Sequence, residues 1–378
     1  MEFWDFVEDF HSRVGPGHRF SKEGLQAIQY IRAMMKPFWK EEYATKHPIR
    51  EHLLVAGDIF YFGLIMMREK LQVAETLVGF DGIRKRLAVP KEFDNAWSEV
   101  DTAFRFHIAG VPVEFVPTTQ TEQSPDLKLV IGSEDVWVEV TSVNPASEDR
   151  VSLILNQIFR MSFMHKVRIS GVISNPHNFR AFTDFESKLQ KAVIDAKTNN
   201  REVTINSRGV YTFRVRPQEM KAPSASDDEG IFVGYSGHRP HIERIQGALR
   251  EKTGKEYHRR GNWYLVLIDR LMNDDEFVRL LASDTGEVSG ILSTYPDVIG
   301  MTVLIPAGVN NPQIPSSALG RKDRRLSVYA IPPYDTEAYV EWENLGIVNN
   351  HSQLFSEVFR NYPRNLEGFL KSRGLEWR

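Results

Sequence analysis

Apolar side chains recur at helical spacing through the first 110 residues. They lie three or four positions apart from Leu25 to Met35 and again from Leu53 to Leu71, as in amphipathic or buried α-helices. A third stretch between Pro90 and Gly110 places Phe93, Trp97, Val100, Phe104 and Ile108 on one helical face. The pattern therefore predicts a helical N-terminal region.

After residue 110 the pattern changes to that of β-strands. Apolar or alternating segments begin at Val111, Asp126 and Asp135, and Gly132-Ser133 forms a plausible turn between the last two. Because side chains alternate along a strand, those following Asp135 divide into two faces. Val136, Val138 and Val140 share the apolar face, and Asp135, Trp137, Glu139 and Thr141 share the other.

The remainder of the chain alternates helices and strands. Helices are predicted at 148–165, 179–197, 242–252 and the last 30 residues; strands at 203–215 and from Val167, Asn262 and Ile299; loops at 221–230 and 306–325. This order favours an α/β fold with a mixed sheet flanked by helices. The predicted ranges are a helical region at 1–89, an α/β domain at 90–310 and a C-terminal loop and helical region at 311–378.

Composition narrows the chemistry. The 378 residues include no cysteine, which excludes disulfides, thiolate zinc sites and cysteine nucleophiles. The acidic start MEFWDFVEDF lacks the order of a signal peptide, and the longest apolar stretch, 53–67, is too short to span a bilayer. We expect a cytoplasmic protein without a membrane partner. The net charge of -3 indicates no global attraction to nucleic acid, although a local basic patch is sufficient.

Acidic residues carry the strongest chemical signal. Asp126 begins one strand and Glu139 lies in the middle of the next, so an antiparallel hairpin would bring both carboxylates together on one face. Two carboxylates completed by water make an acceptable site for Mg²⁺ or Mn²⁺. Glu99, on the preceding helix, could reach the same place. A hairpin with one solvated face gives the same alternation without function, but Glu139 is flanked by valines, and burying a carboxylate without a partner is costly.

These segments resemble the PD-(D/E)XK nuclease superfamily, which includes restriction endonucleases. The resemblance rests on Ser98-Glu99, VPVEFVP, SPDLKLVIG and VWVEVTSV followed by a helix, over roughly residues 90–175, with the helix at Ile242 and the strand NWYLVLID as further core elements. It implies a restriction-endonuclease-like fold. It also implies that Asp126, Glu139, Glu99 and the carbonyl group of Val140 bind the metal.

The pattern departs from this superfamily at Thr141, where its members carry a lysine that orients the attacking water and offsets charge on the phosphate. In one interpretation the lysine has moved to Lys128, which points the same way as Asp126 from the neighbouring strand. In the other, the site is degenerate, and the domain binds nucleic acid or a protein partner without cutting it.

Further polar residues are candidates for phosphate contacts. Gln157 lies on the helix after the motif strand, and four basic residues lie in predicted loops: Arg259, Arg260, Arg321 and Lys322. Each is also compatible with a solvated surface. The spacing of Arg160 and His165 resembles the HEPN ribonuclease motif, a third interpretation that requires a mainly helical fold.

The sequence thus predicts a metal-dependent nuclease or nuclease-like protein that uses Mg²⁺ or Mn²⁺. The resemblance implies a role in defence or repair. It also implies that the partner is DNA in preference to RNA, and it is compatible with a homodimer. The alternative is a catalytically inactive nuclease-like module.

Overall fold

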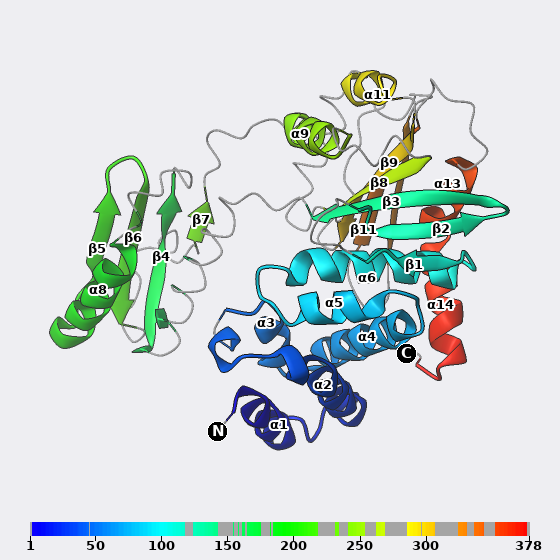
Figure 1. The fold of residues 1–378 in the computed structure, drawn as a ribbon. Helices are drawn as coiled ribbons and strands as arrows, with labels where there is room; N and C mark the ends of the chain where they lie inside the picture. The colour runs from blue at the N-terminus through cyan, green and yellow to red at the C-terminus, as the bar shows by residue number, and fades with distance from the viewer. Residues whose placement is uncertain are drawn as a thin grey trace. The chain divides into compact units, whose positions relative to one another are not determined.

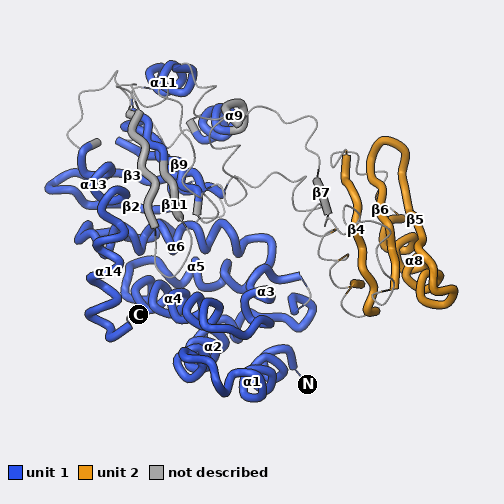
Figure 2. Tube along the Cα trace, turned by 180° about the vertical axis from the view of Figure 1, so that it is seen from behind, with its two compact units in different colours: residues 1–143, 241–378 blue, residues 144–240 orange. Residues whose placement is uncertain are grey.

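The structure is a computed structural model. It describes residues 2–44, 46–117, 124–142, 154, 158, 161–162, 165–174, 182, 184–217, 231–233, 241–253, 262–268, 286–295, 297–306, 324–330, 336–343 and 352–375. Two compact units divide the chain, and Figure 2 colours them separately. The first unit contains residues 1–143 and 241–378, and the second contains residues 144–240.

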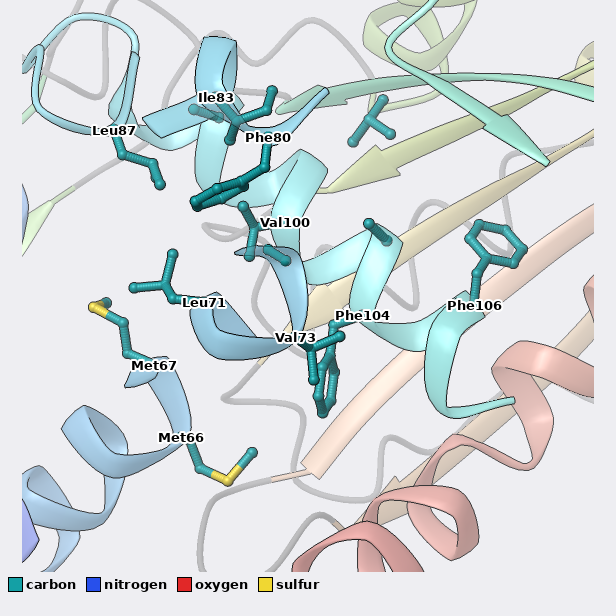
Figure 3. Packing of buried hydrophobic residues seen from close by; sticks show 14 of the residues in the cluster. Met66, Met67, Leu71, Val73, Phe80, Ile83, Leu87, Val100, Phe104 and Phe106 are labelled. Carbon is teal, nitrogen blue, oxygen red and sulfur yellow. The ribbon is translucent and has the colours of Figure 1, made fainter. Parts of the chain in front are cut away.

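Helices occupy the chain before the first strand, as predicted. They are α1 (Phe3–Val14), α2 (Ser21–Met35), α3 (Ile49–Leu53), α4 (Asp58–Glu75), α5 (Phe80–Leu87) and α6 (Phe93–Ile108), with short 3-10 turns at Lys36–Phe38 and Glu41–Tyr43. The helix predicted from Leu53 to Leu71 begins later, because α3 ends at Leu53 and α4 follows Gly57. Figure 3 shows residues of α4, α5 and α6, such as Leu71, Ile83 and Val100, in one packed cluster.

A mixed sheet of seven strands forms the centre of the first unit (Figure 1). Its order is β1-β2-β3-β8-β9-β11-β10. The strands are β1 (Val113–Phe115), β2 (Leu127–Ile131), β3 (Glu134–Ser142), β8 (Trp263–Ile268), β9 (Val298–Pro306), β10 (Arg324–Ala330) and β11 (Thr336–Glu343). The first three form an antiparallel meander, β8 and β9 run parallel to β3, and β11 and β10 complete the sheet in antiparallel pairings.

Helices pack on both faces of this sheet, which confirms the predicted α/β class. On one face, α6, α13 (Ser352–Arg360) and α14 (Tyr362–Ser372) share a core with the alternate side chains Val138, Tyr264 and Val266. On the other face, α9 (His241–Thr253) and α11 (Glu287–Leu292) pack against Trp263 and Leu265. Alternation along each strand thus supplies two separate apolar surfaces.

The structure divides the chain differently from the predicted ranges 1–89, 90–310 and 311–378. A single apolar core extends from Trp4 in α1 through the sheet to Leu370 in α14, so the N-terminal and C-terminal helices belong to the same unit as the sheet. β10 and β11 are additional strands that the periodicity did not predict. The predicted loop at 221–230 and most of that at 306–325 lie outside the described residues.

The second unit has its own sheet and core. Its strands are β4 (Val167–Ile173), β5 (Val203–Ser207), β6 (Tyr211–Pro217) and β7 (Ile231–Val233), in the order β5-β6-β4-β7. The helix α8 (Phe185–Asn199) packs against β5 and β6, and its apolar side chains share a cluster with Tyr211, Phe213 and Val215. The described positions within the predicted helix 148–165 are helical.

The resemblance over residues 90–175 would place the strand at Val167 in the core sheet, and the structure corrects this expectation. β4 pairs with β6 and β7, not with the sheet that contains Glu139. The parallel neighbour of β3 is β8, more than 100 residues later in the chain. Periodicity identifies a strand but not the sheet it joins, because pairing depends on tertiary contacts.

A buried histidine makes the stability of the first unit depend on pH. The ring of His47 donates from Nε2 to the carbonyl oxygen of Leu87 at 3.0 Å, and its Nδ1 accepts from the backbone nitrogen of Ile49 at 3.2 Å. Protonation would therefore break the second hydrogen bond. Burial lowers the pKa of His47 from 6.5 to about 4, although the bond to Leu87 acts in the opposite direction.

We predict that stability falls as the pH decreases from about 6.5 to about 4, because the unfolded chain binds a proton that the folded chain rejects over that interval. The full loss from this residue is about 3 kcal/mol. Urea unfolding of wild type and His47→Gln between pH 7.5 and 4.5 measures it, and the variant should show a shallower decline. The matched control is His52→Gln at an exposed position. If both variants follow the wild-type curve, His47 does not cause the dependence.

Candidate functional site

The hairpin of β2 and β3 positions two of the predicted site residues. Gly132 has φ +64°, which suits the first central position of a two-residue turn, and Ile131 pairs with Glu134 across it. The ladder continues to Leu127 opposite Val138, and the backbone nitrogen of Asp126 donates to the carbonyl oxygen of Val138 at 3.2 Å. The expected antiparallel pairing is confirmed, and Asp126 lies at the level of Glu139.

Asp126 is held against β3 by its own side chain. Its Oδ2 accepts a hydrogen bond from the backbone nitrogen of Val140 at 2.8 Å. This contact directs the carboxylate of Asp126 towards the middle of β3, next to Glu139. The side chain of Asp126 is partly buried and that of Val140 is buried.

Glu139 is a buried carboxylate paired with a lysine. Its side chain is 2% exposed, and its Oε1 lies 2.7 Å from Nζ of Lys252 in the last turn of α9. The face of the hairpin at this position is therefore covered and not solvated, because α9 packs over it. Lys252 did not emerge from the sequence, where it is simply the last residue of a predicted helix.

Glu99 in α6 makes a similar pairing with an arginine of α5. Nη1 and Nη2 of Arg86 contact its two carboxylate oxygens at 2.8 and 2.7 Å, a bidentate geometry that fixes the carboxylate plane. The side chain of Glu99 is 2% exposed and that of Arg86 is 25% exposed. Arg86 also lies 3.5 Å from Glu92. It occurs in a run of basic residues that the sequence pattern does not distinguish from a solvated face.

The three acidic residues are near enough for their charges to affect one another. Burial, followed by the negative charges of Glu99 and Glu139, raises the pKa of Asp126 well above its usual range. Burial also raises the pKa of Glu99, with a further contribution from Glu139 and an opposing one from Arg86. Glu99, Asp126 and Glu139 thus form one cluster, and its near cations are Arg86 and Lys252.

Of the other predicted residues, Lys128 and Thr141 lie in the same hairpin, and most of the rest fall outside the described chain. Lys128 pairs with Asp135 at 3.0 Å, and its Nζ lies 5.8 Å from the ring centre of Trp137. Thr141 is partly buried in β3, two residues after Glu139. The remaining candidates fall outside the described residues: Gln157, Arg160, Arg259, Arg260, Arg321 and Lys322. His165 is described and partly buried in the second unit.

The donor types at the cluster fit a hard divalent cation, since Asp126 and Glu139 offer carboxylate oxygens and Mg²⁺ or Mn²⁺ prefers oxygen. In the described part of the chain, no group of three or more histidine or acidic side chains is arranged to hold a metal. An ion would therefore bind to Asp126 and Glu139 with water in the remaining positions. The backbone carbonyl of Val140 and the carboxylate of Glu99 are the other oxygen donors in the sequence-predicted set.

Comparisons with models of protein families, with curated proteins and with solved structures returned no match. Within the described residues, no helix has both the length and the apolar character needed to cross a membrane.

The charge balance of the cluster leads to a prediction about stability. Asp126→Asn removes one of three neighbouring negative charges while leaving an oxygen to accept from Val140, so the variant should be more stable in the absence of divalent ions. The expected gain is on the order of 1 kcal/mol, or roughly 2–4 °C in Tm. Mg²⁺ or Mn²⁺ should raise the Tm of the wild type by mass action and that of Asp126→Asn much less.

The matched control is Glu134→Gln, a carboxylate-to-amide change at the exposed end of the same hairpin. It should leave the Tm and the response to metal near the wild-type values. Equal metal responses in all three proteins, measured by differential scanning fluorimetry, would place any metal site elsewhere.

Proposed function

We propose that this protein is a metal-dependent nuclease that hydrolyses phosphodiester bonds in DNA. The observation that carries the proposal is the position of Asp126 opposite Glu139 in the hairpin, where the backbone nitrogen of Val140 holds Asp126 at 2.8 Å and Lys252 lies 2.7 Å from Glu139. Carboxylates that are buried together repel one another and lower the stability of the fold. Such groups are therefore common where a functional site requires their charge. These residue types suit a metal-dependent hydrolytic site.

The order of elements around the cluster supports the proposal. A helix, α6, precedes the antiparallel meander β1-β2-β3, and α9 then leads to β8, which is parallel to β3. This helix, meander, helix, strand order resembles the core of the PD-(D/E)XK superfamily. The second unit, residues 144–240, is inserted between β3 and α9. A restriction-endonuclease-like core with an inserted unit is therefore the fold that we assign to this arrangement.

The chain's own residues have distinct roles in this proposal. Asp126 and Glu139, with the carbonyl oxygen of Val140, would hold Mg²⁺ or Mn²⁺. The ion, when bound, supplies Lewis-acid polarisation of the phosphate and lowers the pKa of a bound water. The backbone nitrogen of Val140 orients Asp126 through the 2.8 Å hydrogen bond. Arg86 orients Glu99 through its bidentate contact.

Lys252 supplies the positive charge that Thr141 lacks. A lysine two residues after Glu139 would approach the site from the same strand, whereas Lys252 approaches from α9 and contacts Glu139 directly at 2.7 Å. Its ammonium group is placed to offset negative charge that develops on a phosphate and to orient the attacking water. Lys128 is the weaker candidate, because its ammonium group is paired with Asp135.

The second candidate function is a nuclease-like module that binds nucleic acid or a protein partner without catalysis. The ion pairs themselves favour it, since Arg86 and Lys252 already neutralise two of the three carboxylates. A structural ion pair of this kind offsets the buried negative charge without requiring a metal. Cleavage assays distinguish the two functions.

We predict Mn²⁺-dependent cleavage of plasmid and duplex oligonucleotides by the wild type, and its loss in Asp126→Asn and Glu139→Gln. Lys252→Met should lower kcat by about 10²–10³-fold, as expected when a charged group that stabilises a transition state is removed. Binding of the substrate should weaken far less. Arg250→Met, an exposed change on the same helix, is the matched control and should retain activity.

A direct comparison with Lys128→Met decides which lysine has the role. If cleavage is lost in Lys252→Met and retained in Lys128→Met, Lys252 is the lysine that acts in catalysis. The reverse result assigns this role to Lys128. Cleavage that survives Glu139→Gln would come from another site. No cleavage under any metal condition, with folded protein by circular dichroism, favours the inactive module.

A further inference from the structure

Arg86 in α5 holds its guanidinium group against two glutamates. Nη1 and Nη2 contact the two carboxylate oxygens of Glu99 at 2.8 and 2.7 Å, and Nε lies 3.5 Å from Oε2 of Glu92. Every nitrogen of the guanidinium group therefore faces a carboxylate. The planar fork of an arginine matches both oxygens of one carboxylate, so this contact fixes the position of the positive charge as well as its sign.

Arg86 also lies close to the first of the predicted metal ligands. Burial acts to lower the pKa of Arg86, but its contact with Glu99 and the charges of Asp126 and Glu92 raise it. Asp126 accepts its own hydrogen bond from the backbone nitrogen of Val140, which is a neutral donor. Arg86 is therefore a fixed positive charge within electrostatic reach of Asp126.

The bidentate contact bears on which carboxylates can hold a metal. With a metal–oxygen distance of about 2.1 Å, a divalent ion on either oxygen of Glu99 would lie within about 5 Å of the guanidinium group. Two positive groups at that separation repel each other, and they do so more strongly where burial reduces screening by water. The side chain of Glu99 is 2% exposed, so this condition holds there. Glu99 could bind an ion only if Arg86 moved away.

We propose that Arg86 takes the place of a second metal ion, so that the site binds one divalent ion through Asp126 and Glu139, and Glu99 is not a ligand. The assignment rests on the metal site of the proposed function, but not on cleavage. It differs from the role that the resemblance gives to Glu99. Arg86 is then a positioning residue, which keeps Glu99 neutralised and supplies a fixed positive charge near Asp126.

Titration of the full chain with Mn²⁺ alone, followed by calorimetry and by electron paramagnetic resonance of the free ion, measures how many ions bind. The wild type should bind one Mn²⁺ per chain. Arg86→Met releases Glu99 from its cation and should bind a second ion, and Arg86→Met/Glu99→Gln should bind only one. The matched control is Lys85→Met, which removes an exposed positive charge from the same helix and should also bind one ion.

The double variant provides a test that does not require Arg86→Met to fold. Arg86→Met leaves the carboxylate of Glu99 buried without its partner, which destabilises the fold in the absence of metal. Arg86→Met/Glu99→Gln removes both charges together and should remain folded by circular dichroism. Its affinity for Mn²⁺ should lie within about 10-fold of the wild-type affinity, because no ligand of the ion is removed.

Two ions bound by the wild type would overturn the proposal, as would the absence of any bound ion. Loss of the ion in the double variant would also overturn it, because the Arg86–Glu99 pair would then be needed to bind the metal. A folded Arg86→Met that binds one ion, or Lys85→Met that binds two, would show that Arg86 does not exclude a second ion. Cleavage is a separate result: one bound ion without cleavage retains this assignment and rejects the nuclease, whereas two ions with cleavage does the reverse.

Discussion

A carboxylate in the interior of a sheet requires a cation, and Glu139 obtains one from Lys252. The two residues are 113 positions apart in the chain, yet Oε1 and Nζ lie 2.7 Å apart. Leaving either charge buried and alone would cost several kcal/mol, on the order of 3–5 for a broken buried pair. The last turn of α9 must therefore lie over β3. That contact brings together the two segments of the first unit that the 144–240 insertion separates.

Asp101, which is buried, and Asp126, which is partly buried, show how neighbours decide whether such a charge stabilises the fold. Burial would raise the pKa of Asp101, but Arg105 and Lys70 overcome it and hold that pKa below its usual range. Asp126 has the opposite balance, because burial and two neighbouring carboxylates raise its pKa despite the hydrogen bond from Val140. Asp101 is typical of a structural ion pair among helices. Asp126 has a strongly perturbed environment of the kind that is common at functional sites.

The two units meet the requirements of folding separately. The first has apolar clusters on both faces of its sheet, and the second has its own cluster around α8 and β6. The insertion thus has an apolar cluster that is separate from those of the first unit.

The sequence by itself determined the helices and the hairpin of this protein to a large extent, because these elements depend on local interactions. Periodicity identified α2, α6, α9 and the strands of the hairpin, and Gly132 marked its turn, because these features depend on residues within a few positions of one another. Alternation also placed Asp126 and Glu139 on neighbouring strands. Only the tertiary structure decided that β4 joins a separate sheet, that β8 lies beside β3, and that Arg86 and Lys252 accompany the acids. Strand partners and buried ion pairs are chosen by which distant surfaces can be packed together, and no local pattern encodes that choice.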